Sequence, residues 1–226
     1  MLTYAQLPLV EQAILTLAGL LLVSSFALLA QSRVVATIQI FAWQGVLLAA
    51  TTALVAVDSG SGHLFISAGL TLGLKAFFIP WLLIRQARSL GIIKQFDALI
   101  RPGITLLIAG TLVIFCYNVA LPVRQFAESN TRDTFAISLA LVMLAMLMLV
   151  TRRQAITQVV AFMSLENGLF FAAVSATHGM PMVVELGIAF DVLVAAVIFG
   201  VFFFHIRDSI ESLDVDQLNK LSEDKD

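Results

Sequence analysis

The sequence predicts an all-α polytopic membrane protein, and three observations lead to this fold class. Of the 226 residues, 60% are hydrophobic and only 12% are charged, about half of the charge that covers an ordinary soluble globule. The apolar residues gather in seven runs of about 20 residues each, the length that one helix needs to cross a bilayer. Nearly all basic residues fall between these runs, most of them on alternate connectors.

The seven expected spans form a single transmembrane domain over residues 1–207, followed by an acidic cytoplasmic tail over 208–226. The spans cover residues 10–30, 34–57, 63–84, 104–123, 134–150, 155–177 and 182–206. Runs such as FAISLALVMLAMLMLV are apolar on every face, which favours helices over the alternating strands of a β-barrel. The first run has neither a basic start nor a small-residue cleavage site, so we expect it to remain as a helix.

The distribution of basic residues predicts the orientation. Ten of them lie on the second, fourth, sixth and eighth hydrophilic segments, whereas the odd-numbered segments carry only Arg124 and Arg132. The ten are Arg33, Arg85, Arg88, Lys94, Arg101, Arg152, Arg153, Arg207, Lys220 and Lys225. Because cytoplasmic loops carry the excess of Lys and Arg, we expect the N-terminus outside and the C-terminus in the cytoplasm.

The composition also excludes several function classes. A nucleic-acid-binding protein needs a basic excess, whereas this chain has 13 basic and 15 acidic residues. The single cysteine, Cys116, excludes a multi-cysteine metal or iron–sulfur site. His63, His178 and His205 all fall at expected span ends, and no nucleotide-binding glycine loop is present. We therefore expect no catalytic residue, metal or cofactor of the chain's own, and we expect the lipid bilayer as a partner.

One lysine and three acids lie inside the expected spans, beyond the first two residues of each span. Lys75 is close to the centre of the third span, and Glu166 is near the middle of the sixth. Asp191 lies well inside the seventh span, and Glu185 is nearer its outer end. A charge at the centre of the bilayer costs about 2.5–3.5 kcal/mol on insertion scales. Side chains that carry such a cost usually face protein or water and serve a function.

Two interpretations of these residues stay open. Burial favours a neutral carboxyl and a nearby ammonium favours a carboxylate, so an acid under both influences exchanges a proton near physiological pH. This reasoning predicts a proton path over Glu166, Asp191, Lys75 and Glu185. In the alternative, Lys75 forms a purely structural salt bridge with Glu166 or Asp191. Glu185 can equally be an interfacial acid that complements a helix dipole.

Polar neighbours support the first interpretation. Ser164 and Asn167 flank Glu166 with a hydroxyl and an amide, which provide hydrogen bonds and leave room for water. Gln44 adds an amide inside the second span, and Gln39 lies one turn and a half before it. We expect Gln44, Ser164 and Asn167 to support the path without carrying charge.

The helix that carries Lys75 has two further features. Gly69 and Gly73 form a small-xxx-small face, which lets another helix approach closely. Pro80 follows Lys75 by one turn and a half, so we expect a freed backbone carbonyl and a kink near the charge.

Two hydrophilic segments carry weaker signals. Residues 85–101 mix basic and apolar side chains, which fits an amphipathic helix along the cytoplasmic interface or a connector packed on the bundle. The tail over 208–226 is acidic and is expected to be solvated, with docking on a soluble partner as the alternative.

A resemblance to a known family rests on motifs that occur together. The sequence LENG at 165–168, the sequence ELGIAFD at 185–191, and Lys75 followed by Pro80 resemble component E of the hydrogenase-4 and formate-hydrogenlyase group. This resemblance covers essentially the full length. Residues 151–206 also resemble the K subunit of respiratory NADH–quinone oxidoreductase and the C subunit of multisubunit Na⁺/H⁺ antiporters.

The resemblance implies a non-catalytic subunit of an energy-converting hydrogenase, a complex I-like oxidoreductase assembly in the plasma (inner) membrane of a prokaryote. Its partners would be the other membrane and peripheral subunits, and the chain itself would hold no redox centre. Glu166 and Asp191 would belong to a hydrophilic axis that translocates protons. The K-subunit pattern has Glu at the position of Asp191, so the resemblance to the K subunit is less exact at that position.

Two other functions remain as alternatives. A subunit of a Na⁺/H⁺ antiporter would share the relay but lack a redox partner, and co-purified subunits would discriminate the two. A purely structural membrane-anchor subunit would use its buried charges only to lock helices together.

Overall fold

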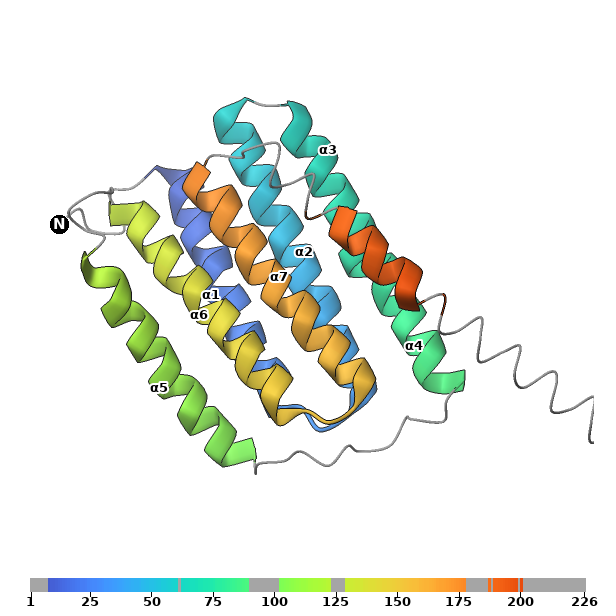
Figure 1. The fold of residues 1–226 in the computed structure, drawn as a ribbon. Helices are drawn as coiled ribbons and strands as arrows, with labels where there is room; N and C mark the ends of the chain where they lie inside the picture. The colour runs from blue at the N-terminus through green and yellow to red at the C-terminus, as the bar shows by residue number, and fades with distance from the viewer. Residues whose placement is uncertain are drawn as a thin grey trace, which may run out of the picture.

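The computed structural model describes residues 8–60, 62–89, 102–122, 129–177, 187, 189–198 and 200. The described part of the chain is helical throughout apart from short connections, and it contains no strand (Figure 1). The labelled elements are α1 (Leu9–Ala30), α2 (Val34–Ser59), α3 (Gly62–Thr71), η2 (Leu72–Phe78), α4 (Ile79–Ser89), α5 (Pro102–Ala120), α6 (Ser129–Thr151) and α7 (Ala155–Thr177). A further short helix covers Ala189–Ile198.

Six of the described helices are long and apolar enough to cross a membrane, which confirms the all-α polytopic membrane class. The third of them, Leu64–Arg88, runs without interruption through α3, η2 and α4. The helix Ala189–Ile198 falls inside the predicted span 182–206, whose other residues are mostly outside the described part. α6 begins at Ser129, five residues before the expected span 134–150.

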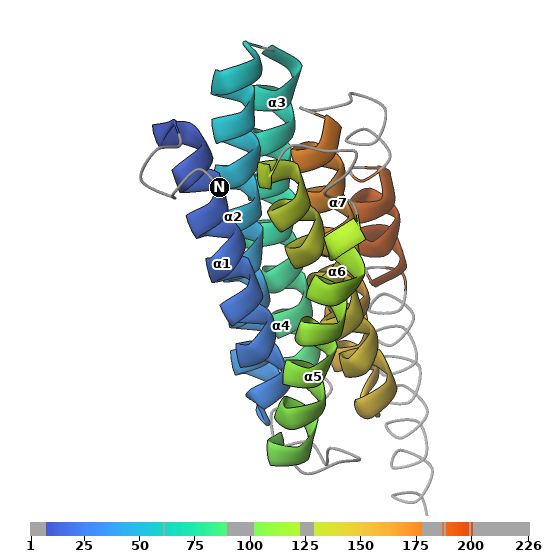
Figure 2. The ribbon, with the colours of Figure 1, turned by 90° about the vertical axis from the view of Figure 1, so that its left-hand side faces the viewer.

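The helices form a bundle in which α2 and α7 are central (Figures 1 and 2). α2 packs against α1, α3, η2, α4 and α7, whereas α7 packs mainly against α6 and α2. α5 lies on the outer side of the bundle, where it contacts α6 and α1. The elements that hold the central polar side chains are therefore covered by others.

The buried apolar residues separate into two clusters along the bundle. On α2, one cluster contains Ile38 and Phe41, and the other contains Leu48 and Val55. α1, α7 and the helix from α3 to α4 each likewise contribute residues to both clusters, one cluster towards each end of the helix. On each of these helices the sequence between the two clusters carries a buried polar residue, namely Ser25, Gln44, Lys75 and Ser164. The bundle thus has a polar layer between two apolar ones.

The helix that carries Lys75 widens around this residue. Residues Leu72–Phe78 form a π-helix, η2, and the amide of Ile79 donates to the carbonyl oxygen of Leu74, five residues earlier. Pro80 has no amide hydrogen, and its ring clashes with a carbonyl four residues before it in an α-helix. The predicted local deviation near the charge therefore takes the form of a π-helical segment, a feature found often at functional sites.

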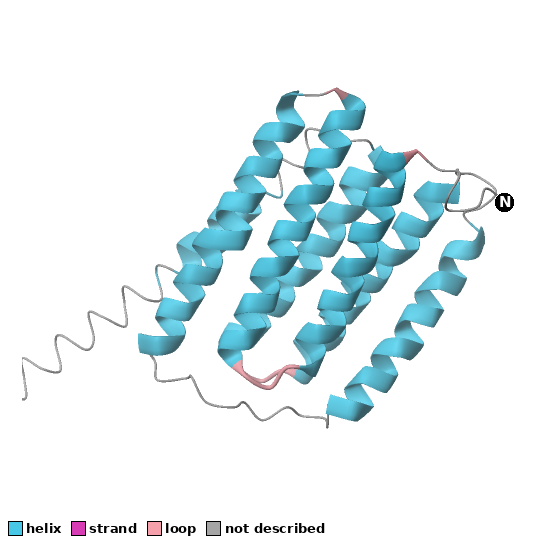
Figure 3. Cartoon of the chain, turned by 180° about the vertical axis from the view of Figure 1, so that it is seen from behind, coloured by secondary structure: helices cyan, strands magenta, loops and turns pink. Residues whose placement is uncertain are grey.

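The described connectors divide between two ends of the bundle. The α1–α2 and α6–α7 connectors and the end of α4 lie at one end (Figures 1 and 3), together with Arg33, Arg85, Arg88, Arg152 and Arg153. We call this the basic end. The α2–α3 turn lies at the opposite end, where Gly60 adopts a φ of 64° that favours glycine at a helix C-terminus. Which end faces the cytoplasm stays a prediction.

Candidate functional site

Lys75 projects from η2 into the centre of the bundle, and only 1% of its surface is exposed. Gly45 of α2 lies directly against its backbone. A Cβ atom at Gly45 would come within 2.9 Å of the Lys75 carbonyl carbon and 3.0 Å of the Ala76 nitrogen. The absence of a side chain at position 45 therefore allows α2 and η2 to approach closely at the level of the ammonium.

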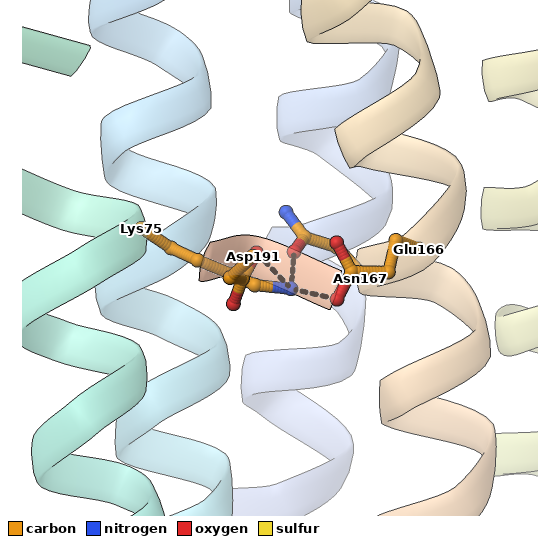
Figure 4. Close-up of polar contacts among 4 residues, drawn as sticks. All are labelled: Lys75, Glu166, Asn167 and Asp191. Atoms are coloured by element: carbon orange, nitrogen blue, oxygen red, sulfur yellow. Dashed lines mark hydrogen bonds and ion pairs between the residues drawn. The ribbon is translucent and has the colours of Figure 1, made fainter. Parts of the chain in front are cut away.

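The Lys75 ammonium joins side chains from two other helices (Figure 4). Nζ donates to Glu166 Oε1 at 2.8 Å and to Asn167 Oδ1 at 3.0 Å, both on α7. It forms a longer ion pair of 3.5 Å with Asp191 Oδ1, on the helix Ala189–Ile198. Nζ also lies 5.5 Å from the centre of the Phe170 ring, within the range of a cation–π contact. We call Lys75, Glu166, Asn167 and Asp191 the charge site.

The charge site has more acceptors than the lysine satisfies. Glu166 Oε2 and Asp191 Oδ1 are buried without a hydrogen-bond partner among the described residues, as is the donor Asn167 Nδ2. Two carboxyl groups thus share one ammonium. Water does not compensate for the shortage at Asp191, because its side chain is only 2% exposed. Because an uncompensated buried charge is expensive, the site is suited to hold an additional proton.

A second set of hydrogen bonds lies beside the charge site. The Gln44 amide nitrogen donates to Ser25 Oγ at 2.9 Å, and Ser164 Oγ donates to Gln44 Oε1 at 3.1 Å. Ser25 Oγ in turn donates to the Leu21 carbonyl oxygen at 3.2 Å. This chain crosses α1, α2 and α7 and reaches α7 two residues before Glu166.

Glu166 also borders a groove of about 390 Å³. The groove lies between α7 and the segment around Phe190, and its other lining residues are Phe162, Leu165, Leu169, Phe170 and Gly187. The Glu166 side chain is 12% exposed, more than those of Lys75 and Asp191. Glu166 is therefore the member of the charge site nearest to the surface of the described chain.

Six of the seven residues predicted from the sequence lie in or beside this layer. Lys75, Glu166, Asn167 and Asp191 meet at one nitrogen atom, while Gln44 and Ser164 bond to each other. The seventh, Glu185, lies outside the described residues. Gln39 is exposed and takes no part in the layer.

The predicted helix contact at Gly69 and Gly73 is wrong within the described chain, since nothing comes within 4 Å of a Cβ atom built at either position. The close approaches occur instead at Gly45, against Lys75, and at Gly168, against Val142. Both glycines follow polar residues, Gln44 and Asn167. Gly60 and Gly62 also follow polar residues, yet no described atom lies within 4 Å of a Cβ atom at either position, so this adjacency alone does not predict a close approach.

Arg152 was expected as an ordinary connector residue, but it is only 4% exposed. Its Nη2 atom donates to the carbonyl oxygens of Leu29 and Gln31, both at 2.7 Å. Burial lowers the pKa of Arg152, but an arginine stays protonated in proteins. The residue therefore caps the C-terminal end of α1 with a positive charge, where the helix dipole favours a cation.

These features define a polytopic α-helical membrane protein with a buried centre of one lysine and two carboxyl groups. The described residues hold no group of three or more side chains arranged to bind a metal ion.

Comparison with known proteins finds relatives that are similar to this chain over most of its length. The chain is 24% identical over 205 residues to hydrogenase-4 component E of Escherichia coli (strain K12), covering 91% of this chain and 95% of the relative. It is 29% identical over 205 residues to the uncharacterized protein Rv0085 of Mycobacterium tuberculosis (strain ATCC 25618 / H37Rv), covering 90% and 93%. The chain is thus similar over nearly its full length to hydrogenase-4 component E, the group that its motifs resemble. No protein-family model and no solved structure matches the chain.

Proposed function

We propose that this chain is a non-catalytic membrane subunit of an energy-converting hydrogenase, a complex I-like assembly in the plasma membrane of a prokaryote. The component E relatives and the six apolar helices support this assignment. In this proposal electrons move in other subunits of the assembly. This chain contributes ionisable side chains to a proton path that is coupled to that electron transfer.

The observation that carries the proposal is the imbalance of charge around the Lys75 ammonium. With both carboxyl groups ionised, Lys75, Glu166 and Asp191 have a net charge of −1, and one added proton makes the site neutral. The proton can reside on either acid, because both acids have an oxygen within 3.5 Å of the same nitrogen. A site that changes between these two states takes up and releases one proton.

The other residues have distinct parts in this proposal. Asn167 holds the ammonium beside Glu166 through its 3.0 Å hydrogen bond. Gln44 and Ser164 extend the polar layer from α7 towards α1 and the basic end. Glu185 remains part of the proposed path on the sequence alone.

The test is the Glu166→Gln variant in the assembled complex, reconstituted in sealed vesicles. Glutamine keeps an oxygen that accepts from Lys75 but holds no exchangeable acidic proton, so we expect assembly and electron transfer without coupled proton movement. Glu11→Gln, in the first turn of α1, is the matched control and should behave as the wild type. Normal proton translocation by Glu166→Gln would refute the proposal.

The 2.8 Å ion pair between Lys75 and Glu166 favours one competing function, a purely structural membrane anchor. In that case Lys75→Ala or Asp191→Asn should prevent assembly, while Glu166→Gln should leave transport intact. The Na⁺/H⁺ antiporter alternative predicts a different set of co-purified subunits, which mass spectrometry of the complex in mild detergent would identify.

A further inference from the structure

A row of buried hydroxyl groups extends from the charge site towards the α2–α3 end. Thr71 and Ser67 of α3 precede Lys75 by four and eight residues, so the three side chains lie on nearly the same face of the helix. All three are buried, with exposed fractions of 1% for Lys75, 1% for Thr71 and 3% for Ser67. The face that α3 turns towards the bundle therefore carries hydroxyl groups over two turns beyond Lys75, beside the buried Leu64 and Ala68.

This row crosses an apolar cluster, in which Thr51 and Thr52 of α2 are buried as well. The cluster at this level contains Leu48, Val55, Ala56, Leu64, Phe171 and Val174. A hydroxyl placed in an apolar environment without a hydrogen bond costs about 1–3 kcal/mol by protein mutational data. The hydroxyls on this face of α3 therefore need partners.

Ser67 differs from other buried hydroxyls of the bundle in its bonding. Thr51 and Thr52 each donate at 2.9 Å to a backbone carbonyl oxygen four residues earlier, and Ser25 does so at 3.2 Å. Ser67 Oγ is buried and has no hydrogen-bond partner among the described residues. Its hydrogen-bonding capacity is thus available to a molecule that enters the row.

The facing surface of α2 has no side chain at Gly45 and carries a hydroxyl group at Thr52. Gly45 lies against Lys75, and Thr52 follows Gly45 by seven residues, which returns it to the same face of α2. Thr52 is fully buried, and α2 packs against α3 along this interface (Figure 2). The interface between α2 and α3 thus offers hydroxyl groups from both helices beyond the charge site.

We propose that Ser67 and Thr71 hold a single file of water molecules between the Lys75 ammonium and the α2–α3 end. Eight residues of helix separate Ser67 from Lys75, about 12 Å at the helical rise per residue, so water must bridge the distance. Ser67 lies five residues from the beginning of α3 at Gly62, which leaves about 7.5 Å to the end of the helix.

This row gives the charge site a second polar connection. The chain of Ser164, Gln44 and Ser25 leads towards the basic end, because Ser25 lies close to the C-terminal end of α1. The row of Thr71 and Ser67 leads to the opposite end. The proposal that water occupies this row does not depend on the proposed function. The proposal that protons enter or leave through the row rests on the proposed function.

The test of the water file is the reaction of Ag⁺ with a thiol placed in the row. In a Cys116→Ala background, the full chain in lipid vesicles carries Ser67→Cys, and Ag⁺ replaces the thiol proton to form the silver thiolate. Denaturation and maleimide labelling then count the remaining free thiols. Ala56→Cys is the matched control, since Ala56 is fully buried among apolar side chains and lies nearer to the same end.

We expect Ag⁺ to protect the thiol of Ser67→Cys from maleimide while that of Ala56→Cys stays fully labelled. Equal labelling of the two variants, whether both react or neither does, would overturn the water file. In the assembled complex Thr71→Val should slow proton translocation by about tenfold or more, and Thr71→Ser should restore it. Wild-type translocation by Thr71→Val would overturn the use of the row by protons.

The failures of the two proposals are distinguishable. If Ser67→Cys is protected but Glu166→Gln translocates protons normally, the water file stands and the proposed function fails. If Glu166→Gln is uncoupled but Ser67→Cys is not protected, the proposed function stands and the water file fails.

Discussion

Replacing Gly45 by alanine should loosen the bundle at the charge site. The added methyl carbon would lie 2.9 Å from the Lys75 carbonyl carbon and 3.1 Å from Lys75 Cβ. Two of the three nearest atoms belong to the backbone of η2, so a rotation of a flexible side chain cannot relieve the contact. Either α2 or η2 must move, and movement of η2 carries the Lys75 ammonium away from Glu166.

The expected magnitude follows from two opposing effects. Inserting a methyl group into a packed interior costs about 1–3 kcal/mol, while replacing glycine by alanine within a helix gains about 1 kcal/mol. For Gly45→Ala we therefore expect a net loss of up to about 2 kcal/mol in the free energy of unfolding. Gly69→Ala measures the gain from alanine in a helix by itself, since no described atom lies within 4 Å of a Cβ atom at that position.

The assay is reversible unfolding of the purified full chain in mixed micelles, followed by circular dichroism. Gly69→Ala should be as stable as the wild type or slightly more stable, whereas Gly45→Ala should be less stable. The difference between the two variants should be about 1–3 kcal/mol, the packing cost alone. Equal stability of the two variants would show that α2 and η2 do not meet at Gly45 as closely as the structure places them.

Two further predictions concern the buried cations. Arg152→Gln should lower the free energy of unfolding by about 1.5–3 kcal/mol, because it removes charged hydrogen bonds to the end of α1. Arg153→Gln, at an exposed position, should change it by less than about 0.5 kcal/mol in the same assay; similar losses would contradict the capping role. Lys75→Met should cost about 3–5 kcal/mol because it leaves carboxyl groups without their cation. The same change in a Glu166→Gln background should cost less, and a double-mutant cycle without coupling would contradict the ion pair.

The composition of the sequence was sufficient for the fold class and for most of the charge site. A lysine and two acids inside apolar runs must find one another or water, because the bilayer offers neither a counter-ion nor a hydrogen bond. That energetic argument selects Lys75, Glu166 and Asp191 without any knowledge of the packing. The structure then brings both acids within 3.5 Å of the Lys75 ammonium nitrogen.

The features that the sequence did not reveal depend on which faces meet. Glycines, serines and threonines occur throughout these helices, and the sequence alone does not distinguish Gly45 from Gly69 or Ser67 from Ser59. Only the packing of α2 on η2 makes Gly45 a contact and leaves Gly69 exposed. For the same reason the sequence does not predict the burial of Arg152, because its partners are backbone carbonyl oxygens at the C-terminal end of α1.

The arrangement of the layers explains how one chain holds a charged centre without losing its stability. The two apolar clusters pack above and below the polar layer on the same helices, so the bundle does not depend on the charges for its packing. The charge site in turn connects three elements through one ammonium, and two of its carboxyl oxygens have no hydrogen-bond partner in the part of the chain that the structure describes. A centre built only to lock helices would satisfy these oxygens, because each unpaired acceptor weakens the fold. Their presence beside a single ammonium is in keeping with the change in proton occupancy that we propose for this centre.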